Sequence, residues 1–283
     1  MDYSNPEIPE GINTTEEHPL KEFAILSAGI IGIIAIVVLV LSLLAELLAP
    51  HIPFAMEQKL SSKVISIDKH QSDEEIYLAS LVEKMSAQIA LPDEMQISIH
   101  YVDDEVENAF ATLGGHILIH RGLLEIMPNE NALSMVIAHE IAHIQHRHPL
   151  IAMGRGVVVG LFLATLTGIS GDRLVSGIVN KAGVITVLGF SREQEREADL
   201  TALTAIEKHY GHVNGASDLF KVLLDIEKQQ LVQAPQFMNT HPLSTGRIDS
   251  LEHYAQVNDW SMREQEVPLP EWFARGSVNE DSK

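Results

Sequence analysis

The 283-residue chain contains no cysteine. A disulfide framework is therefore excluded, and so is a metal site built on thiolates. If the protein binds a metal, histidine and carboxylate side chains must supply the ligands. The absence of cysteine is compatible with either side of a bacterial membrane, so it does not identify the compartment.

Basic residues are also few. The chain has 19 Lys and Arg residues against 39 Asp and Glu residues, which gives a formal net charge of -20. Proteins that bind nucleic acid need clustered lysine and arginine to neutralise the phosphates. The charge balance therefore predicts that nucleic acid is not a partner.

Much of the hydrophobic content lies in one run near the N-terminus. Phe23 to Ala49 is almost wholly apolar, interrupted only by small residues and by Glu46, and Pro50 and Pro53 follow it. A helix needs about 20 apolar residues to cross the hydrocarbon core of a bilayer. The apolar part of a secretory signal peptide is shorter, at about 7–15 residues. We therefore expect residues 23–49 to be a single transmembrane anchor in contact with lipid.

The charges that flank this run bear on its orientation. Residues 1–22 are polar and acidic, which predicts a disordered tail, and Lys21 is their only strong base. Lys59, Lys63 and Lys69 follow the run. The positive-inside rule favours a cytoplasmic C-terminal part. Because Lys69 lies at the edge of the window in which charges count, the side stays open.

The sequence pattern of the soluble part predicts one domain of helices and strands at residues 60–256. Residues 73–90 have helical periodicity, residues 96–102 alternate as a strand, and Gly114-Gly115 precedes a second strand at 116–120. Further helices are expected within residues 123–147, 192–209, 216–231 and 247–256. The acidic residues 257–283 are expected to form an extended C-terminal tail.

Residues 150–190 are rich in Gly, Val, Leu and Ile. Their longest uncharged run, Gly156 to Gly171, has about 16 residues, while a spanning helix usually has about 17–25. We therefore favour glycine-rich helices packed over the soluble domain, with a hairpin in the membrane as the alternative.

The motif with the clearest chemistry is His139-Glu140-Ile141-Ala142-His143. Two histidines four residues apart lie on one face of a helix, one turn apart. Both imidazoles can then reach one Zn²⁺ at about 2.0–2.1 Å. Glu140 lies at the edge of the same site, where a carboxylate can act as a general base on a metal-bound water. His146 and His148 follow, and there we expect a C-terminal helix cap.

A catalytic zinc site needs a third protein ligand and an open position. Glu195 and Asp199 are four residues apart on a predicted helix, and their face continues to apolar residues, so it points inward. We assign Glu195 as the third ligand and Asp199 as an acceptor for the other ring N–H of a ligating histidine. Glu193 and Glu197 lie on other faces and are expected to be solvated.

Together these motifs resemble the gluzincin metallopeptidases that include the heat-shock protease HtpX and the CAAX prenyl proteases. The resemblance covers about residues 60–256. It rests on His139-Glu140-x-x-His143, Ser191-Arg192-x-x-Glu195-x-x-Ala198-Asp199, Asn108-Ala109-Phe110, Gly114-Gly115, Gly122-Leu123-Leu124 and Thr240-His241-Pro242 with Arg247. The single expected anchor is more similar to the small bacterial members than to the CAAX proteases, which have many spans.

The resemblance implies an α+β, mainly helical domain with a small antiparallel sheet and one zinc ion per chain. It implies His139, His143 and Glu195 as ligands and Glu140 as the base. It also implies that His241 or Arg247 is near the active site, at the oxyanion or at the base of the cleft. A buried structural histidine is an equal alternative for His241.

The resulting hypothesis is a zinc endopeptidase anchored in a membrane, with the bacterial inner membrane expected. Glu140 would assist the attack of a zinc-bound water on a peptide bond, in membrane or envelope protein quality control. Protein or peptide substrates would pair as a strand near residues 116–120. The alternative is a non-proteolytic zinc-bound chaperone or scaffold at the membrane.

Overall fold

The computed structural model describes residues 18–62, 72–167, 189–229 and 235–273. Most of this part of the chain is helical, with one small sheet. The expectations for residues 1–17, 168–188 and 274–283 lie outside the described residues. The elements in chain order are α1 (Pro19–Leu48), η1 (Ala49–His51), α2 (Phe54–Ser61), α3 (Asp73–Ser86), β1 (Ser98–Val102), β2 (Ala109–Thr112), β3 (His116–His120), α4 (Arg121–Glu125), α5 (Glu130–Gln145), α6 (His148–Thr167), α9 (Arg192–Tyr210), α10 (Asp218–Gln229), α11 (Gln236–Thr240) and α12 (Thr245–Val257).

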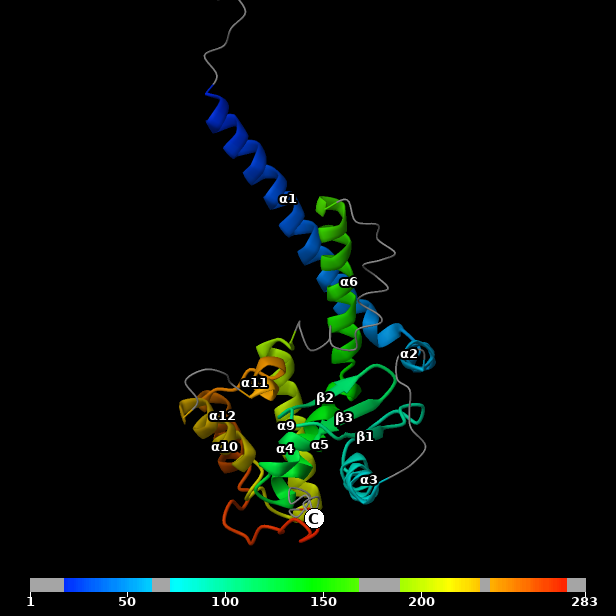
Figure 1. Cartoon of the computed structure of the whole chain (residues 1–283), viewed down its shortest axis with the longest axis vertical. Coiled ribbons are helices and arrows are strands. Elements are labelled where there is room, and N and C mark those ends of the chain that lie inside the picture. The colour runs from blue at the N-terminus through cyan, green and yellow to red at the C-terminus, as the bar shows by residue number, and fades with distance from the viewer. Residues whose placement is uncertain (1–17, 63–71, 168–188, 230–234, 274–283) are drawn as a thin grey trace, which may run out of the picture.

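Helix α1 is long and apolar enough to cross a membrane, and its N-terminal half extends away from the rest of the described chain (Figure 1). It begins at Pro19 rather than at Phe23, so residues 19–22 are helical and not part of a disordered tail. Proline is favoured in the first turn of a helix, where its missing N–H costs nothing. Together with η1, α1 forms a candidate span from Pro19 to His51.

Helix α6 lies beside the C-terminal half of α1 (Figure 1). A Cβ atom added to Gly154 would lie 3.1 Å from the Cβ of Ala45, so the absence of a side chain at Gly154 lets the two helices approach closely. Arg155 of α6 also forms an ion pair with Glu46 of α1. In its described part, this glycine-rich segment packs against α1, and it also contacts the rest of the domain through α5 and β2.

The sheet is mixed, and the expectation of an antiparallel sheet is wrong. The strand order is β1-β3-β2; β1 is parallel to β3, and β2 is antiparallel to β3. The chain first crosses from β1 to the far edge as β2. A tight turn at Gly114 and Gly115, with φ of 77° and 85°, then returns it through the middle as β3. A Cβ at Gly115 would lie 2.1 Å from the carbonyl oxygen of Gln96, so only glycine fits there.

This strand order also corrects the expected substrate strand. Residues 116–120 form β3, the central strand, whose two neighbours already use its backbone groups. An added strand needs a free edge. The edges of this sheet are β1 and β2, and β2 is the edge that packs against α5.

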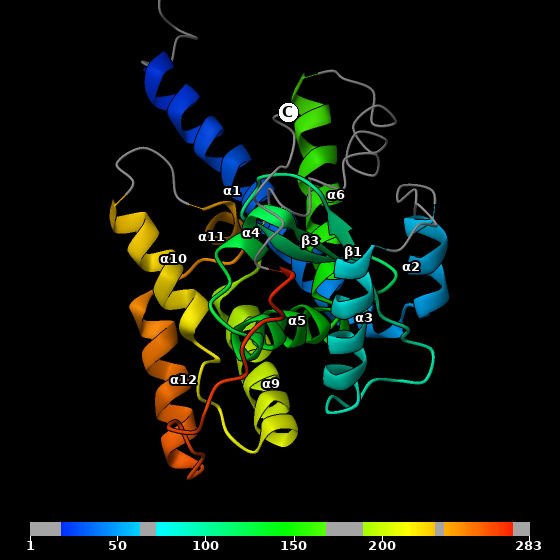
Figure 2. The ribbon, with the colours of Figure 1, turned by 60° about the horizontal axis from the view of Figure 1, so that its bottom comes forward.

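Helix α5 is the centre of the domain, and every residue from Glu130 to Ile144 is buried. It begins where the Asn129 side chain accepts a hydrogen bond from the Ala132 N–H at 2.7 Å. Its main neighbours are α9, α3 and β2. In Figures 1 and 2, α3 lies on one side of α5 while α10 and α12 lie side by side on the other. A helix buried all round can carry polar side chains only where they have partners.

The remaining predicted helices are present with small shifts at their ends. Helix α9 begins with a capping box, in which Ser191 and Gln194 exchange hydrogen bonds, and it ends at Tyr210, where Gly211 with φ 74° is the C-cap. The short helix α11 is not among the predicted elements. The predicted extended C-terminal segment lies against the domain: the Val267 carbonyl accepts a hydrogen bond from the Glu130 N–H, and the Val267 N–H donates to Asn131 Oδ1, both at 2.8 Å.

Candidate metal centre

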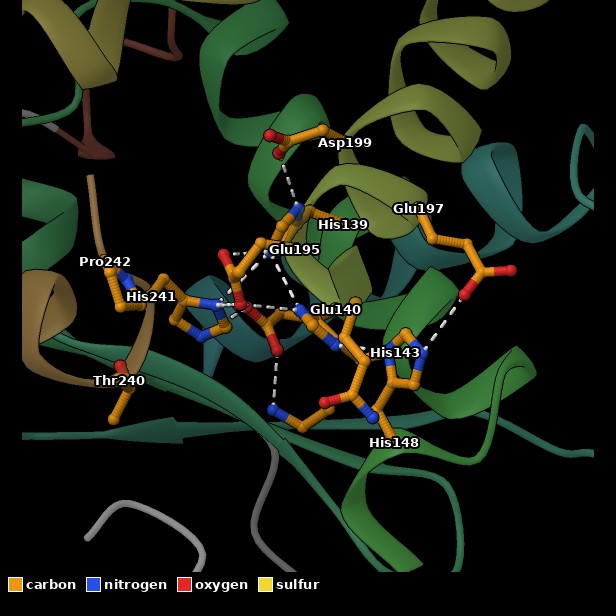
Figure 3. Close-up of polar contacts among 12 residues, drawn as sticks. His139, Glu140, His143, His148, Glu195, Glu197, Asp199, Thr240, His241 and Pro242 are labelled. Atoms are coloured by element: carbon orange, nitrogen blue, oxygen red, sulfur yellow. Dashed lines mark hydrogen bonds and ion pairs between the residues drawn. The ribbon is translucent and has the colours of Figure 1, made fainter. Parts of the chain in front are cut away.

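Four buried side chains from three parts of the chain meet at one point. They are His139 and His143 of α5, Glu195 of α9 and His241, which directly follows α11, and each offers a ligand atom within 4.8 Å of all the others. Figure 3 shows their side chains converging between the two helices. Among the described residues, this is the one group of three or more histidine and acidic residues with metal-binding spacing.

The distances show which atoms face the centre. His139 Nε2 and His143 Nε2 are 2.9 Å apart. Glu195 Oε2 lies 3.6 Å from the first of these nitrogens, and Glu195 Oε1 lies 3.4 Å from the second. His241 Nδ1 lies 3.2 Å from His139 Nε2 and 3.1 Å from Glu195 Oε1. The α5 histidines thus face the centre with Nε2, which leaves their Nδ1 atoms for other partners.

Glu140 lies beside this centre and is completely buried. Its Oε2 accepts a hydrogen bond from the Ala111 N–H of β2 at 2.6 Å. Its Oε1 lies 3.3 Å from His241 Nε2. Burial raises the pKa of Glu140, because the charged carboxylate is poorly solvated there. A buried carboxyl group with a raised pKa is suited to taking up a proton near neutral pH.

Asp199 and Arg247 support one side of the centre. Asp199 Oδ1 lies 3.0 Å from His139 Nδ1, which is the contact expected from the sequence. Arg247 bonds Asp199 through two of its nitrogens and reaches Glu195 Oε2 with a third at 2.7 Å. Burial by itself raises the pKa of Asp199, but hydrogen bonds and charge from His139 and Arg247 hold it below its usual value. Arg247 therefore contacts the carboxylates of the site from behind.

His146 is the C-cap residue of α5, as expected for one of the two histidines, while the side chains of His146 and His148 point to Glu197 of α9. Helix α5 ends at Gln145, and Arg147, at φ 63°, separates it from α6. His146 Nδ1 and His148 Nε2 lie 3.3 and 3.4 Å from the two oxygens of Glu197. The expectation of a fully solvated Glu197 is therefore only half right: this side chain is 50% exposed but contacts both histidines. Burial lowers the pKa of His148 to about 3, so this ring is neutral.

Two side chains of the site carry no sequence signal that would have assigned their contacts. His148 Nδ1 lies 2.8 Å from His143 Nδ1. The ring of Phe190 stacks on that of His143, with centroids 3.9 Å apart and planes at 21°. Phe190 directly precedes the Ser191 motif, but nothing in the sequence indicates which ring it contacts. The turn at Arg147 places His148 beside His143, and the packing of α9 against α5 brings Phe190 to the same ring.

The donor set fits a divalent metal ion. Burial lowers the pKa of His143 well below its usual value, so its ring is neutral and keeps a lone pair for a ligand bond. His139 Nε2 and His143 Nε2, the two buried ring nitrogens that face the centre, lie only 2.9 Å apart. Buried polar atoms without partners are costly, and facing lone pairs need a cation between them. Histidine and carboxylate donors without thiolate are a ligand set of catalytic zinc sites.

Comparison with known proteins agrees with this geometry. Residues 72–255 match the family described as Peptidase family M48. The chain is 31% identical over 182 residues to the mitochondrial metalloendopeptidase OMA1 of Schizosaccharomyces pombe, covering 63% of this chain and 52% of that protein. It is 30% identical over 167 residues to a putative beta-barrel assembly-enhancing protease of Vibrio cholerae, covering 55% of this chain and 34% of that protein.

A third relative matches over a greater length. The chain is 25% identical over 252 residues to a protease HtpX homolog of Dictyoglomus turgidum, with 81% of this chain and 80% of that protein covered. The chain spans about a half and a third, respectively, of the OMA1 and assembly-enhancing relatives. Because the family match covers more than half of the chain and includes the whole candidate centre, this protein belongs to peptidase family M48.

Proposed function

We propose that this protein is a membrane-anchored, zinc-dependent endopeptidase. The observation that carries the proposal is the buried group of His139, His143 and Glu195, with Glu140 beside it. Two neutral imidazoles and one carboxylate are the protein ligands of a known class of catalytic zinc site. His241 lies on the fourth side, where its Nδ1 would face a bound metal beside His139 Nε2 and its Nε2 faces Glu140.

Zinc held by these residues would supply a Lewis acid that polarises a peptide carbonyl and lowers the pKa of a water molecule. Glu140 takes the proton from the attacking water and then passes it to the amine that leaves. The Ala111 N–H holds one carboxylate oxygen of Glu140, so the other oxygen stays directed toward the reacting groups. Asp199 and Arg247 keep His139 and Glu195 in place from behind.

The free edge of β2 is where we place an extended substrate. The His120 N–H donates to the Asn108 carbonyl, so Asn108, Phe110 and Thr112 turn their backbone groups toward β3. By alternation, Ala109 and Ala111 turn theirs outward. The bond from the outward Ala111 N–H to Glu140 supports this placement, since it sets the edge beside the proposed base. A peptide added as a further strand would therefore run past the zinc ligands.

The anchor and the relatives suggest the setting. Helix α1 is the candidate membrane span. One relative is named a beta-barrel assembly-enhancing protease, and another is a protease HtpX homolog. We therefore propose protein substrates at a membrane, in membrane or envelope quality control, with the bacterial inner membrane as the expected site. The flanking lysines do not decide which side carries the domain.

Replacing the base tests this proposal. Glu140→Gln should bind zinc as the wild type does and should cleave an unfolded protein such as casein about 10²–10⁴-fold more slowly, the usual contribution of a general base. Glu193→Gln, on the exposed face of α9, is the matched control and should cleave normally. A non-proteolytic chaperone or scaffold needs no base. If wild type and Glu140→Gln bind zinc equally and neither cleaves peptide bonds, that alternative replaces the proposal.

A further inference from the structure

The two candidate zinc-binding histidines of α5 are held from outside in different ways. His139 has a carboxylate directly behind it, since its Nδ1 lies 3.0 Å from Asp199 Oδ1. His143 has no carboxylate at the same place. Its Nδ1 instead lies 2.8 Å from Nδ1 of a second histidine, His148, at the start of α6.

The proton positions in this contact follow from the chemistry of imidazole. A neutral histidine that binds metal through Nε2 must carry its proton on Nδ1. His143 therefore donates from Nδ1, and His148 Nδ1 accepts. An imidazole that accepts at Nδ1 carries its own proton on Nε2. His148 Nε2 lies 3.4 Å from Glu197 Oε2, so a carboxylate of α9 comes last in this series of contacts (Figure 3).

Packing leaves these rings little freedom. His143 and His148 are buried, with 0% and 2% of their surfaces exposed. Phe190 stacks on the His143 ring, and its centroid lies 5.9 Å from that of His148. The His143 ring is thus confined by Phe190 on one face and directed by His148 at Nδ1. Glu197, half exposed at the surface of α9, connects this arrangement to solvent.

We propose that His148 is a positioning residue for His143, and that Glu197 is the terminal acceptor of a His143–His148–Glu197 chain. The chain sets the tautomer and the ring orientation of one candidate zinc ligand, as Asp199 does for the other. Partners of this kind typically change metal affinity roughly 10–100-fold when removed. The inference rests on the proposed zinc site and adds two residues to it.

Variants at His148 test the chain in the full-length protein in detergent. His148→Phe keeps a ring of similar size but has no acceptor, whereas His148→Asn has an oxygen near the position of Nδ1. His148→Phe should weaken zinc binding roughly 10–100-fold in chelator competition and should alter the visible spectrum of the Co²⁺-substituted protein. His148→Asn should restore both toward wild type. Glu197→Ala should give a smaller loss of affinity.

His146→Asn is the matched control, because His146 also contacts Glu197 but does not touch His143. It should bind zinc within about twofold of wild type, since it leaves the bond to the zinc ligand intact. The unfolding temperature of the metal-free variants separates loss of positioning from loss of fold. If His148→Phe does not fold, the zinc affinities of His148→Asn and Glu197→Ala test the proposed chain instead.

The inference is overturned if the His148 variants fold and bind zinc like wild type, or if His148→Asn is as weak as a folded His148→Phe. A wild-type protein that binds zinc and cleaves normally while His148→Phe is unaffected contradicts this inference alone. A wild-type protein that binds no zinc contradicts both this inference and the proposed function.

Discussion

Arg247 holds Asp199 with two parallel hydrogen bonds, Nε to Oδ2 at 2.8 Å and Nη2 to Oδ1 at 2.7 Å. A two-point pair of this kind sets geometry as well as charge. Because Asp199 Oδ1 also faces His139 Nδ1, the orientation of a candidate metal ligand depends on a residue of α12. The third Arg247 nitrogen bonds Glu195, so one guanidinium supports both carboxylates behind the site.

We predict that Arg247→Ala lowers the free energy of unfolding by about 3–5 kcal/mol, the usual cost of leaving buried charge unpaired. Glu195 and Asp199 are nearly inaccessible to solvent, so water cannot replace the guanidinium. Arg247→Lys keeps the charge but cannot form the two-point bond, and it should weaken zinc binding with a smaller loss of stability. Urea unfolding and chelator competition measure the two effects. A fully stable Arg247→Ala protein would contradict this prediction.

We predict that Glu195→Ala abolishes tight zinc binding, since it removes the one carboxylate among the candidate ligands and leaves only His139, His143 and His241. Metal analysis after dialysis measures the bound zinc per chain. Glu193→Ala is the control on the same helix, where an 80% exposed side chain pairs with Arg196 at the surface. Equal zinc content in the two variants would show that Glu195 is not a ligand.

We predict that Ala109→Pro raises KM for an extended peptide substrate and leaves zinc affinity unchanged. Proline removes one outward N–H from the free edge of β2, and proline is tolerated on edge strands. Ala109→Gly, which keeps the N–H, is the control. Steady-state kinetics with a short peptide measures the effect. If the proline variant binds substrate as tightly as the glycine variant, the substrate does not pair at this edge.

We predict that the buried pair of Arg147 and Glu57, 2.7 Å apart, couples the start of the domain to the end of α5. Burial raises the pKa of Glu57 in spite of the nearby Arg147. Arg147→Met should cost about 3–5 kcal/mol of unfolding free energy, while the double variant Arg147→Met with Glu57→Met should recover most of it. Urea unfolding of the four proteins completes the cycle. Additive losses would mean that the two residues act separately.

We predict that the protein loses stability as the pH falls below about 6.5, the unperturbed pKa of histidine. Burial lowers the pKa of His100 and of His116, whose rings share a hydrogen bond at 3.0 Å, although Glu75 acts in the opposite direction on His100. Below this pH the two histidines bind protons more readily in the unfolded chain than in the folded protein. Their contribution to stability is therefore full above this pH and declines below it.

His116→Asn should make this decline shallower, because it removes one of the two buried rings. Unfolding midpoints in urea at pH 7.5, 6.0 and 5.0 measure the slope. His253→Asn, on the exposed surface of α12, is the control. An unchanged slope in His116→Asn would assign the acid sensitivity to other groups.

The local features of this protein could be predicted from its sequence. His139 and His143 share a face because they are four residues apart on a helix, and Glu195 and Asp199 share a face for the same reason. The apolar run of α1 predicts a membrane span by length alone. Each of these predictions depends on residues within a few turns of one another.

The distant relationships could not be predicted in this way. The strand order β1-β3-β2 depends on where the chain returns after β2. The local sequences of β1 and β3 do not predict which strand they pair with. From its position in the sequence Glu197 is expected to be solvated. The packing of α9 on α5 places it against His148.

The sequence by itself determined the candidate ligands, the candidate base and the candidate membrane span, because helical periodicity and hydrophobic length are properties of short segments. Only the tertiary structure decided which partners stand behind those ligands: Arg247 behind Asp199, and His148 behind His143. The first contact forms when burial of the apolar faces of α9 and α12 brings those helices together, and the second depends on the turn at Arg147, which sets the start of α6 against the end of α5.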